Sequence, residues 1–426
     1  MAIHPTLALC AATLGLSAAA LIAGQAWLSI PIFVGAAALV AFVDPTKHIR
    51  HARFQPGRPL FQTRGPGQTC QDDWYLSIMS RSSGETVDVA LMIRKAGTTG
   101  REHEGAYILV IDYARALIAY YRYGLDEVVI PAEQGGPRDF RIEVGDNVFA
   151  SDRVELSLPR ARYCGEQLGA LDNHQRLEAR GGLPERIELQ ARFTNRGPNH
   201  AYNWFQQGIM GLASLIPINS FWPDVLVANA TLEGGWSDFD GRRRHFRPED
   251  HRVYMERYHG SGFPSSWMWG GCQQWVDPER DVSFVYGIVY ESGKMPGAGW
   301  SFGLQVGERF YSFSPGHFGR LDAFTFTEIE GVRRIHGEAR DARGNRVVFD
   351  CVGASADECL PIHGIDEGRF EPALILDHGC AGSIELRFEP RDGPPWTARS
   401  LNPAFEFTGD YASVYAQLRE QTQRGM

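Results

Sequence analysis

The stretch YMERYHGSGFPSSWMWGGCQQW, residues Tyr254 to Trp275, gathers three Trp, two Tyr, one Glu and one His in a single short run. Glycine and proline residues between positions 260 and 264 break the run into two short strands, because these residues interrupt regular pairing. Alternate residues of a strand share one face. The first strand therefore places Tyr254, Glu256 and Tyr258 together on one side.

Short strands of the same kind extend in both directions from this stretch. Runs such as AYILVI, RVELSL, DVSFVYGIVY and SIELRFEP are rich in β-branched and aromatic residues and are separated by Gly, Asp, Asn or Pro turns. Helical periodicity is scarce. The pattern predicts an all-β, mainly antiparallel protein with too many strands for one small barrel. A Trp near the start of the strand runs QDDWYLSIM and SSWMWGGCQQW suggests two successive barrels, divided near Arg244.

The N-terminal segment from Met1 to Val43 contains no Lys, Arg, Asp or Glu. It divides into two apolar halves, 7–23 and 26–43, each near the lower limit for crossing about 30 Å of hydrocarbon. A helical hairpin in a membrane is the expectation, and one long signal-anchor is the alternative. The cations that follow, from Lys47 onward, place the rest of the chain on the cytoplasmic side by the positive-inside bias.

Five segments follow from these patterns. We expect a membrane hairpin or signal-anchor over 1–46, a linker over 47–60, a first β-barrel over 61–244, a second β-barrel over 245–415 and a C-terminal tail over 416–426.

Composition and missing motifs exclude several classes of function. The formal net charge of -9 supplies no basic stripe for a nucleic acid. The seven Cys form no CxxC pair and no His lies at ligand spacing, so neither a disulfide framework nor a metal site is expected. There is no nucleotide-binding glycine loop, no GxSxG and no HExxH. No obligate protein partner is indicated.

Glu256 among aromatic residues suggests acid chemistry. In a dry pocket the charged carboxylate is disfavoured and the pKa of the carboxyl rises, which keeps the acid protonated near neutral pH. The faces of Trp267 and Trp269 carry negative potential that stabilises a cation. Together these groups can protonate an alkene. The alternative is that Glu256 pairs with Arg252 or Arg257 on a strand surface.

The same residues resemble the tocopherol cyclase family. The run from Tyr254 to Gly260, the Phe263–Pro264 pair and the following Trp267, Trp269 and Gln273 match its Tyr-x-Glu…Phe-Pro…Trp-x-Trp segment. QQGIMGLASLIPINSFWPDVLVANATLEGG, VGDNVFASDRVELSL and GSIELRFEPRDGPPW resemble further segments of that family in the same order. The resemblance covers roughly Asp72 to Trp396. It implies tandem lipocalin-like barrels, a prenyl-lipid substrate and no cofactor, with carotenoid 1,2-hydratases as more distant relatives.

The resemblance implies that a prenylated hydroquinone is protonated and closed to a chromanol ring. Glu256 would be the general acid, with Tyr254 and His259 tuning it or taking the phenol proton. The residues expected to bind the substrate are Trp267, Trp269, Gln273, Asp224 and Tyr202. Two alternatives stay open: a hydratase that captures the cation with water, and a membrane-tethered prenyl-lipid carrier without catalysis.

Overall fold

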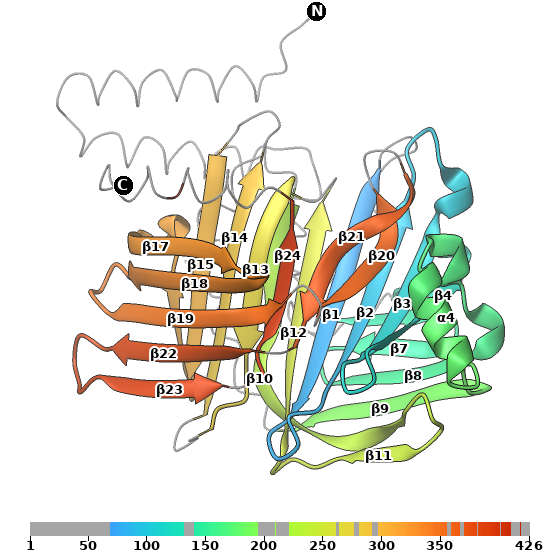
Figure 1. Ribbon diagram of the computed structural model, residues 1–426, viewed down its shortest axis with the longest axis horizontal. Coiled ribbons are helices and arrows are strands. Elements are labelled where there is room, and N and C mark those ends of the chain that lie inside the picture. Colours follow the sequence, from blue (N-terminus) through green and yellow to red (C-terminus); the bar gives the residue numbers. More distant parts are fainter. Residues whose placement is uncertain are drawn as a thin grey trace, which may run out of the picture.

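Antiparallel strands make up most of the structure, as the sequence predicts (Figure 1). The computed structural model describes residues 69–131, 140–194, 209, 221–260, 264–276, 281–291, 297–355, 359–366, 370–380, 382–400, 402–409 and 418. The helix α4 (Leu171–Ala179) lies between strands of the first half. Short 3-10 turns are η1 (Arg101–His103), η2 (Leu125–Glu127), η3 (Arg160–Arg162), η4 (Glu166–Leu168) and η6 (Pro315–His317).

The first half of the described chain forms one 12-stranded sheet, here named the large sheet. Its order is β4-β3-β2-β1-β12-β10-β9-β8-β7-β6-β5, with β11 paired to β10. Its strands are β1 (Cys70–Ser80), β2 (Thr86–Lys95), β3 (Gly105–Asp112), β4 (Leu117–Tyr123), β5 (Val128–Val129), β6 (Arg141–Val144), β7 (Asn147–Ala150), β8 (Arg153–Pro159), β9 (Arg186–Thr194), β10 (Phe221–Ser237), β11 (Arg243–Phe246) and β12 (His251–Gly260).

The large sheet curls around its own hydrophobic core. Side chains from both of its ends, including Ile108 of β3 and Leu158 of β8, meet in one buried cluster. An isolated bridge joins Tyr121 of the edge strand β4 to Tyr163, which follows β8. On β9, inward apolar residues alternate with exposed polar ones, whereas all residues of β1 are buried. β1 therefore has a second covered face, which lies outside the curl.

A 7-stranded sheet, here named the cover sheet, packs on that second face. Figure 1 shows β20 and β21 lying across the first strands of the large sheet. Ile362 of β20 shares a buried cluster with Leu109 of β3, which confirms this contact. The strand order of the cover sheet is β16-β15-β14-β13-β24-β21-β20. Its strands are β13 (Ser266–Cys272), β14 (Val282–Glu291), β15 (Gly297–Val306), β16 (Arg309–Phe313), β20 (Leu360–Asp366), β21 (Glu371–Gly379) and β24 (Ala404–Thr408).

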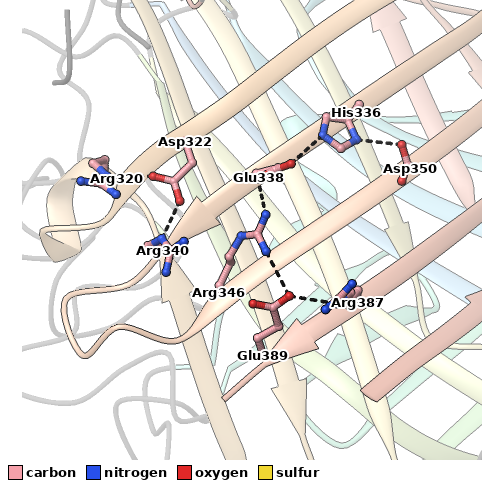
Figure 2. A network of polar contacts seen from close by, with 9 residues as sticks. All are labelled: Arg320, Asp322, His336, Glu338, Arg340, Arg346, Asp350, Arg387 and Glu389. Atoms are coloured by element: carbon pink, nitrogen blue, oxygen red, sulfur yellow. Dashed lines mark hydrogen bonds and ion pairs between the residues drawn. The ribbon is translucent and has the colours of Figure 1, made fainter. Parts of the chain in front are cut away.

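A 5-stranded sheet, here named the outer sheet, packs on the other face of the cover sheet. Its strands, in the order β17-β18-β19-β22-β23, are β17 (Arg320–Ile329), β18 (Val332–Arg340), β19 (Arg346–Ser355), β22 (Ser383–Glu389) and β23 (Trp396–Ser400). Phe349 stacks on Tyr286 of β14 with ring centroids 5.1 Å apart. On the opposite face, cross-strand contacts such as the His336–Asp350 hydrogen bond and the Arg346–Glu389 ion pair join neighbouring strands (Figure 2).

The sequence prediction of two tandem barrels is corrected by the pairing of the described strands. They form three sheets, and each is an open path of strands rather than a closed ring. The reason is β12, which pairs with β1 on one side and β10 on the other and so joins the large sheet. Residues 244 and 245, where the sequence suggests a division, both lie in β11.

The expected membrane hairpin over 1–46 and the linker over 47–60 lie outside the described residues. In the part of the chain that the structure describes, no helix has the length and apolar character needed to cross a bilayer.

Asp72→Ala should destabilise the fold by about 3–5 kcal/mol, the usual cost of removing one partner of a buried ion pair. Arg257 donates from Nε to Asp72 Oδ1 at 2.7 Å, and both side chains are fully buried between β12 and β1. The Arg257 guanidinium also lies 5.0 Å from the centre of the Trp74 ring. Urea unfolding of both proteins measures the difference.

Asp350→Ala is the matched control, because this carboxylate also pairs across two strands but its side chain is 62% exposed. We expect a change within about 0.5 kcal/mol. Equal losses in the two variants would contradict a special role for the buried pair.

Candidate functional site

A cavity of about 410 Å³ lies between the large sheet and the cover sheet. Its walls come from β1, β2, β3, β10 and β12 on one side and mainly from β13, β14, β15, β21 and β24 on the other. Most of the lining is apolar or aromatic, as in pockets that bind small apolar ligands. The carboxyl, guanidinium and imidazole side chains among its lining residues are those of Asp73, Arg94, Glu256, His378 and Glu406.

Glu256 reaches the cavity because β12 alternates between two buried environments. Met255 points into the core of the large sheet, whereas Tyr254 packs in the cluster on the cavity side. Glu256 is 2% exposed. The Tyr254 hydroxyl donates to Oε2 of Glu256 at 2.6 Å, and the Tyr258 hydroxyl donates to Oε1. The carboxyl is therefore held by both neighbours that the strand period places beside it.

Burial raises the pKa of Glu256 to about 7, and the hydrogen bonds from Tyr254 and Tyr258 limit the rise. The charged form loses its hydration in the cavity, which favours the neutral acid. Near neutral pH a large fraction of Glu256 therefore carries a proton. Once the proton leaves, the hydroxyl donors are already placed to stabilise the carboxylate.

The two tryptophans of β13 form the facing wall. Trp267 and Trp269 point to the cavity, while Met268 between them points into the core shared with the outer sheet. The Trp269 ring lies 6.0 Å from the Tyr254 ring and meets Tyr75 edge-on at 5.6 Å. Aromatic surface thus surrounds the Glu256 carboxyl on the side where a ligand would lie.

A second carboxyl, Glu406 of β24, enters the cavity from the cover sheet and is 8% exposed. The Trp267 indole donates to its Oε2 at 3.2 Å. Burial and, to a smaller extent, the charge of Glu256 raise the pKa of Glu406 to about 8. The sequence reading did not select Glu406, although AFEFT places a lone Glu between two Phe, the same type of signal that singled out Glu256.

A hydrogen-bonded cluster around His378 of β21 lies beside Glu406. The Nε2 atom of His378 is 3.5 Å from Glu406 Oε1 and 3.1 Å from the Tyr75 hydroxyl. Tyr75 donates to Asp88 Oδ2 at 2.5 Å. Tyr113 donates to the same oxygen at 2.9 Å, and its hydroxyl also contacts Nδ1 of His378. This cluster joins β1, β2 and the end of β3 to the cover sheet.

Asp88, His378 and Cys380 each offer one potential ligand atom, and these atoms lie within 4.8 Å of one another. Both ring nitrogens of His378 and one oxygen of Asp88 are already hydrogen-bonded to Tyr75 or Tyr113. Hydrogen bonding is therefore the interaction that holds this group together in the structure.

A buried ion pair completes the polar lining. Arg94 of β2 donates from a terminal nitrogen to Asp73 Oδ2 at 3.0 Å across the β1–β2 pair. Burial raises the pKa of Asp73, and the charge of Arg94 lowers it in turn. Because the two charges balance, the pair adds polarity to the cavity lining without adding net charge.

His259 and Asp224 lie on the other face of the large sheet from Glu256. Both are buried, with 3.4 Å between His259 Nδ1 and Asp224 Oδ2. In the strand register Asp224 stands opposite Arg257, and His259 opposite Asp72. The structure therefore does not bring His259 to the Glu256 carboxyl, and neither residue lines the described part of the cavity.

Only some of the other residues expected to bind the substrate line the cavity. Trp267 and Trp269 line the cavity. Gln273 is buried just beyond the end of β13 and is not among the described residues that line the cavity. Tyr202 lies outside the described residues.

The chain matches no protein-family model and no curated protein. Among solved structures it is similar to a candidate AttH protein from Nitrosomonas europaea, with 10% identity, a TM-score of 0.41, and coverage of 84% of this chain and 99% of that one. It is also similar to CghA with Sch210972, with 9% identity, a TM-score of 0.48, and coverage of 80% of this chain and 89% of that one. These comparisons do not show membership of the tocopherol cyclase family.

Glu256→Gln should reduce the pH dependence of stability. The pKa of Glu256 is about 7 in the folded protein and 4.5 for an ordinary Glu, so the unfolded chain releases this proton first as the pH rises. The stability that protonated Glu256 contributes is full below pH 4.5 and is lost as the pH approaches about 7. The loss is on the order of 3 kcal/mol. Urea unfolding at several pH values measures it.

Glu385→Gln serves as the control for this titration, since the Glu385 side chain is 64% exposed on β22. It should leave the wild-type pH dependence unchanged. A Glu256→Gln protein with the full wild-type slope would show that Glu256 is ionised in the folded state well below pH 7.

Proposed function

We propose that this protein is an acid-initiated isoprenoid cyclase that closes a prenylated hydroquinone to a chromanol-type ring. The observation that carries the proposal is the Glu256 carboxyl, buried in a largely apolar cavity, hydrogen-bonded by two tyrosines and faced by two tryptophans. An acid held in its neutral form beside aromatic faces is suited to proton transfer to an alkene. The resemblance to tocopherol cyclases implies the same residue, Glu256, as the acid.

The shape and polarity of the cavity support a prenyl substrate. The apolar surface of Trp300, Val285, Ile375 and Leu376 extends the aromatic wall along the cover sheet. A volume of about 410 Å³ falls within the usual range of small-molecule pockets. The polar groups are concentrated on a few side chains, so a molecule with a long apolar chain and one polar ring matches this distribution.

In the proposed first step the Glu256 proton moves to one carbon of a trisubstituted double bond. The tertiary cation that forms lies against Trp267 and Trp269, whose electron-rich faces stabilise positive charge. At the same time Glu256 becomes a carboxylate, and the Tyr254 and Tyr258 hydroxyls stabilise that charge through hydrogen bonds already in place. The phenol oxygen then bonds to the cation, closes the ring and loses its proton, so the proton given to carbon and the proton lost from oxygen balance.

Glu256→Gln should lower turnover by about 10²–10⁴, because glutamine keeps the shape of the side chain but has no acidic proton. Purified protein is incubated in heavy water with a geranylated hydroquinone, and the product is followed by mass spectrometry. Wild-type protein should give an isomer that carries one carbon-bound deuteron.

Glu233→Gln, on an exposed position of β10, should keep wild-type turnover. A product heavier than the substrate by one water would assign the protein to hydratases. Unchanged substrate that is nevertheless bound would assign it to prenyl-lipid carriers. Full activity of Glu256→Gln would reject Glu256 as the acid.

Trp269→Leu should lower kcat/KM about tenfold, equivalent to about 1–2 kcal/mol of lost cation stabilisation. Trp269→Phe should retain part of that activity, because a phenyl face still interacts with a cation. Trp396→Leu on the outer sheet is the control for loss of a Trp away from the cavity. Equal activity of the Leu and Phe variants at position 269 would show that this residue contributes only bulk.

A further inference from the structure

We propose that His378 is the catalytic base of the same cavity, and that it accepts the proton of a hydroxyl group on the bound molecule while Asp88 positions it. The inference rests on the proposed function and extends it by requiring a ligand with a free hydroxyl group. It adds a proton acceptor on the cover sheet to the proton donor on the large sheet.

The position of His378 fits this role. It is 2% exposed and lines the same cavity as Glu256, from the opposite wall. The Trp269 ring is near both groups: its centroid is 6.5 Å from the His378 ring and 6.0 Å from the ring of Tyr254, whose hydroxyl donates to Glu256. A cation against Trp269 would thus lie near both the donor and the acceptor.

The count of protons in the cluster indicates what His378 can accept. The Tyr75 and Tyr113 hydroxyls each have one proton, and both lie within hydrogen-bond distance of Asp88 Oδ2. Each hydroxyl oxygen also contacts one ring nitrogen of His378. If both hydroxyls donate to an ionised Asp88, both ring nitrogens must donate to the hydroxyls, and this requires a protonated ring.

A neutral ring leaves the cluster one proton short. It has one N–H, so while both tyrosines donate to Asp88 the second ring nitrogen has no proton, and a hydroxyl group of the bound molecule can donate to it. Burial lowers the pKa of His378 to about 3, and burial raises that of Asp88 to about 6. The ring is therefore neutral before the reaction, and its protonated form completes the hydrogen bonds.

A base this weak is sufficient for the proposed reaction. When a hydroxyl oxygen bonds to a tertiary cation, it becomes a trivalent oxonium and its remaining proton is far more acidic than that of a phenol. Transfer to His378 is then downhill even though burial disfavours the charged ring. The hydroxyls of Tyr75 and Tyr113 and the charge of Asp88 stabilise the ring once it is charged.

The return of a proton to Glu256 completes the proton balance. Glu256 gives one proton to carbon, a C–O bond forms, and the hydroxyl proton moves to His378. Glu406 Oε1 is 3.5 Å from His378 Nε2. Glu406 is neutral at rest, so it first gives its own proton to the ionised Glu256 and then takes the proton from His378, which restores both carboxyls after each cycle. No oxidant, reductant or external acid is consumed.

The test compares the binding of two probes, a geranylated hydroquinone and its dimethyl ether, by quenching of the protein's tryptophan fluorescence. Wild-type protein should prefer the free hydroquinone roughly tenfold, as expected for one buried hydrogen bond. His378→Phe should remove the preference while leaving the affinity for the ether within about twofold, since the ring is kept and its nitrogens are lost.

His363→Phe is the matched control, because His363 lies on the neighbouring strand β20 and does not line the cavity. It should keep the wild-type preference. His378→Leu replaces the phenylalanine variant if that protein does not fold. Asp88→Asn should weaken the preference without changing the affinity for the ether, as expected of a positioning residue.

The proposal is overturned if wild-type protein shows no preference, if it binds neither probe, or if both His378 variants retain the preference. The carbon-bound deuteron separately tests the proposed acid step. Hydroxyl preference without deuteration would retain the His378 site and reject the cyclase, whereas deuteration without hydroxyl preference would do the reverse.

Discussion

The register between β12 and β1 is the constraint on which the site depends. Because side chains alternate along a strand, a slip of one residue would move Glu256 from the cavity into the core of the large sheet. The buried pair between Arg257 and Asp72, with Trp74 beside it, opposes such a slip, since a slip would separate two desolvated charges. An ion pair on one face of the sheet thereby keeps the acid on the other.

Assembly of the site also depends on the packing of two different sheets. The large sheet supplies Glu256, and the cover sheet supplies Trp269, His378 and Glu406. Neither sheet alone removes these groups from water. Desolvation raises the pKa of both carboxyls and lowers that of His378, so the packing of the sheets sets the protonation states needed for transfer.

The sequence could predict what local periodicity controls. It identified an all-β chain and placed Tyr258 beside Glu256, because a period of two applies wherever a strand forms. The same parity puts His259 on the opposite face, so its assignment to the site was avoidable. Periodicity could not place Glu406 and His378 beside Glu256, because they reach it through packing between sheets. The prediction of closed barrels is wrong for the same reason, because strands pair with partners that are far away in the sequence.

The two carboxyls explain why an aromatic cavity can hold an acid ready to react. Ionising Glu256 makes it harder to ionise Glu406, since each charge acts on the other across a region of low polarity. The pair therefore resists losing both protons near neutral pH. Cation formation reverses this balance, because a positive charge against Trp267 and Trp269 favours a carboxylate nearby. The acid is thus kept neutral by burial and gives up its proton when positive charge develops in the cavity.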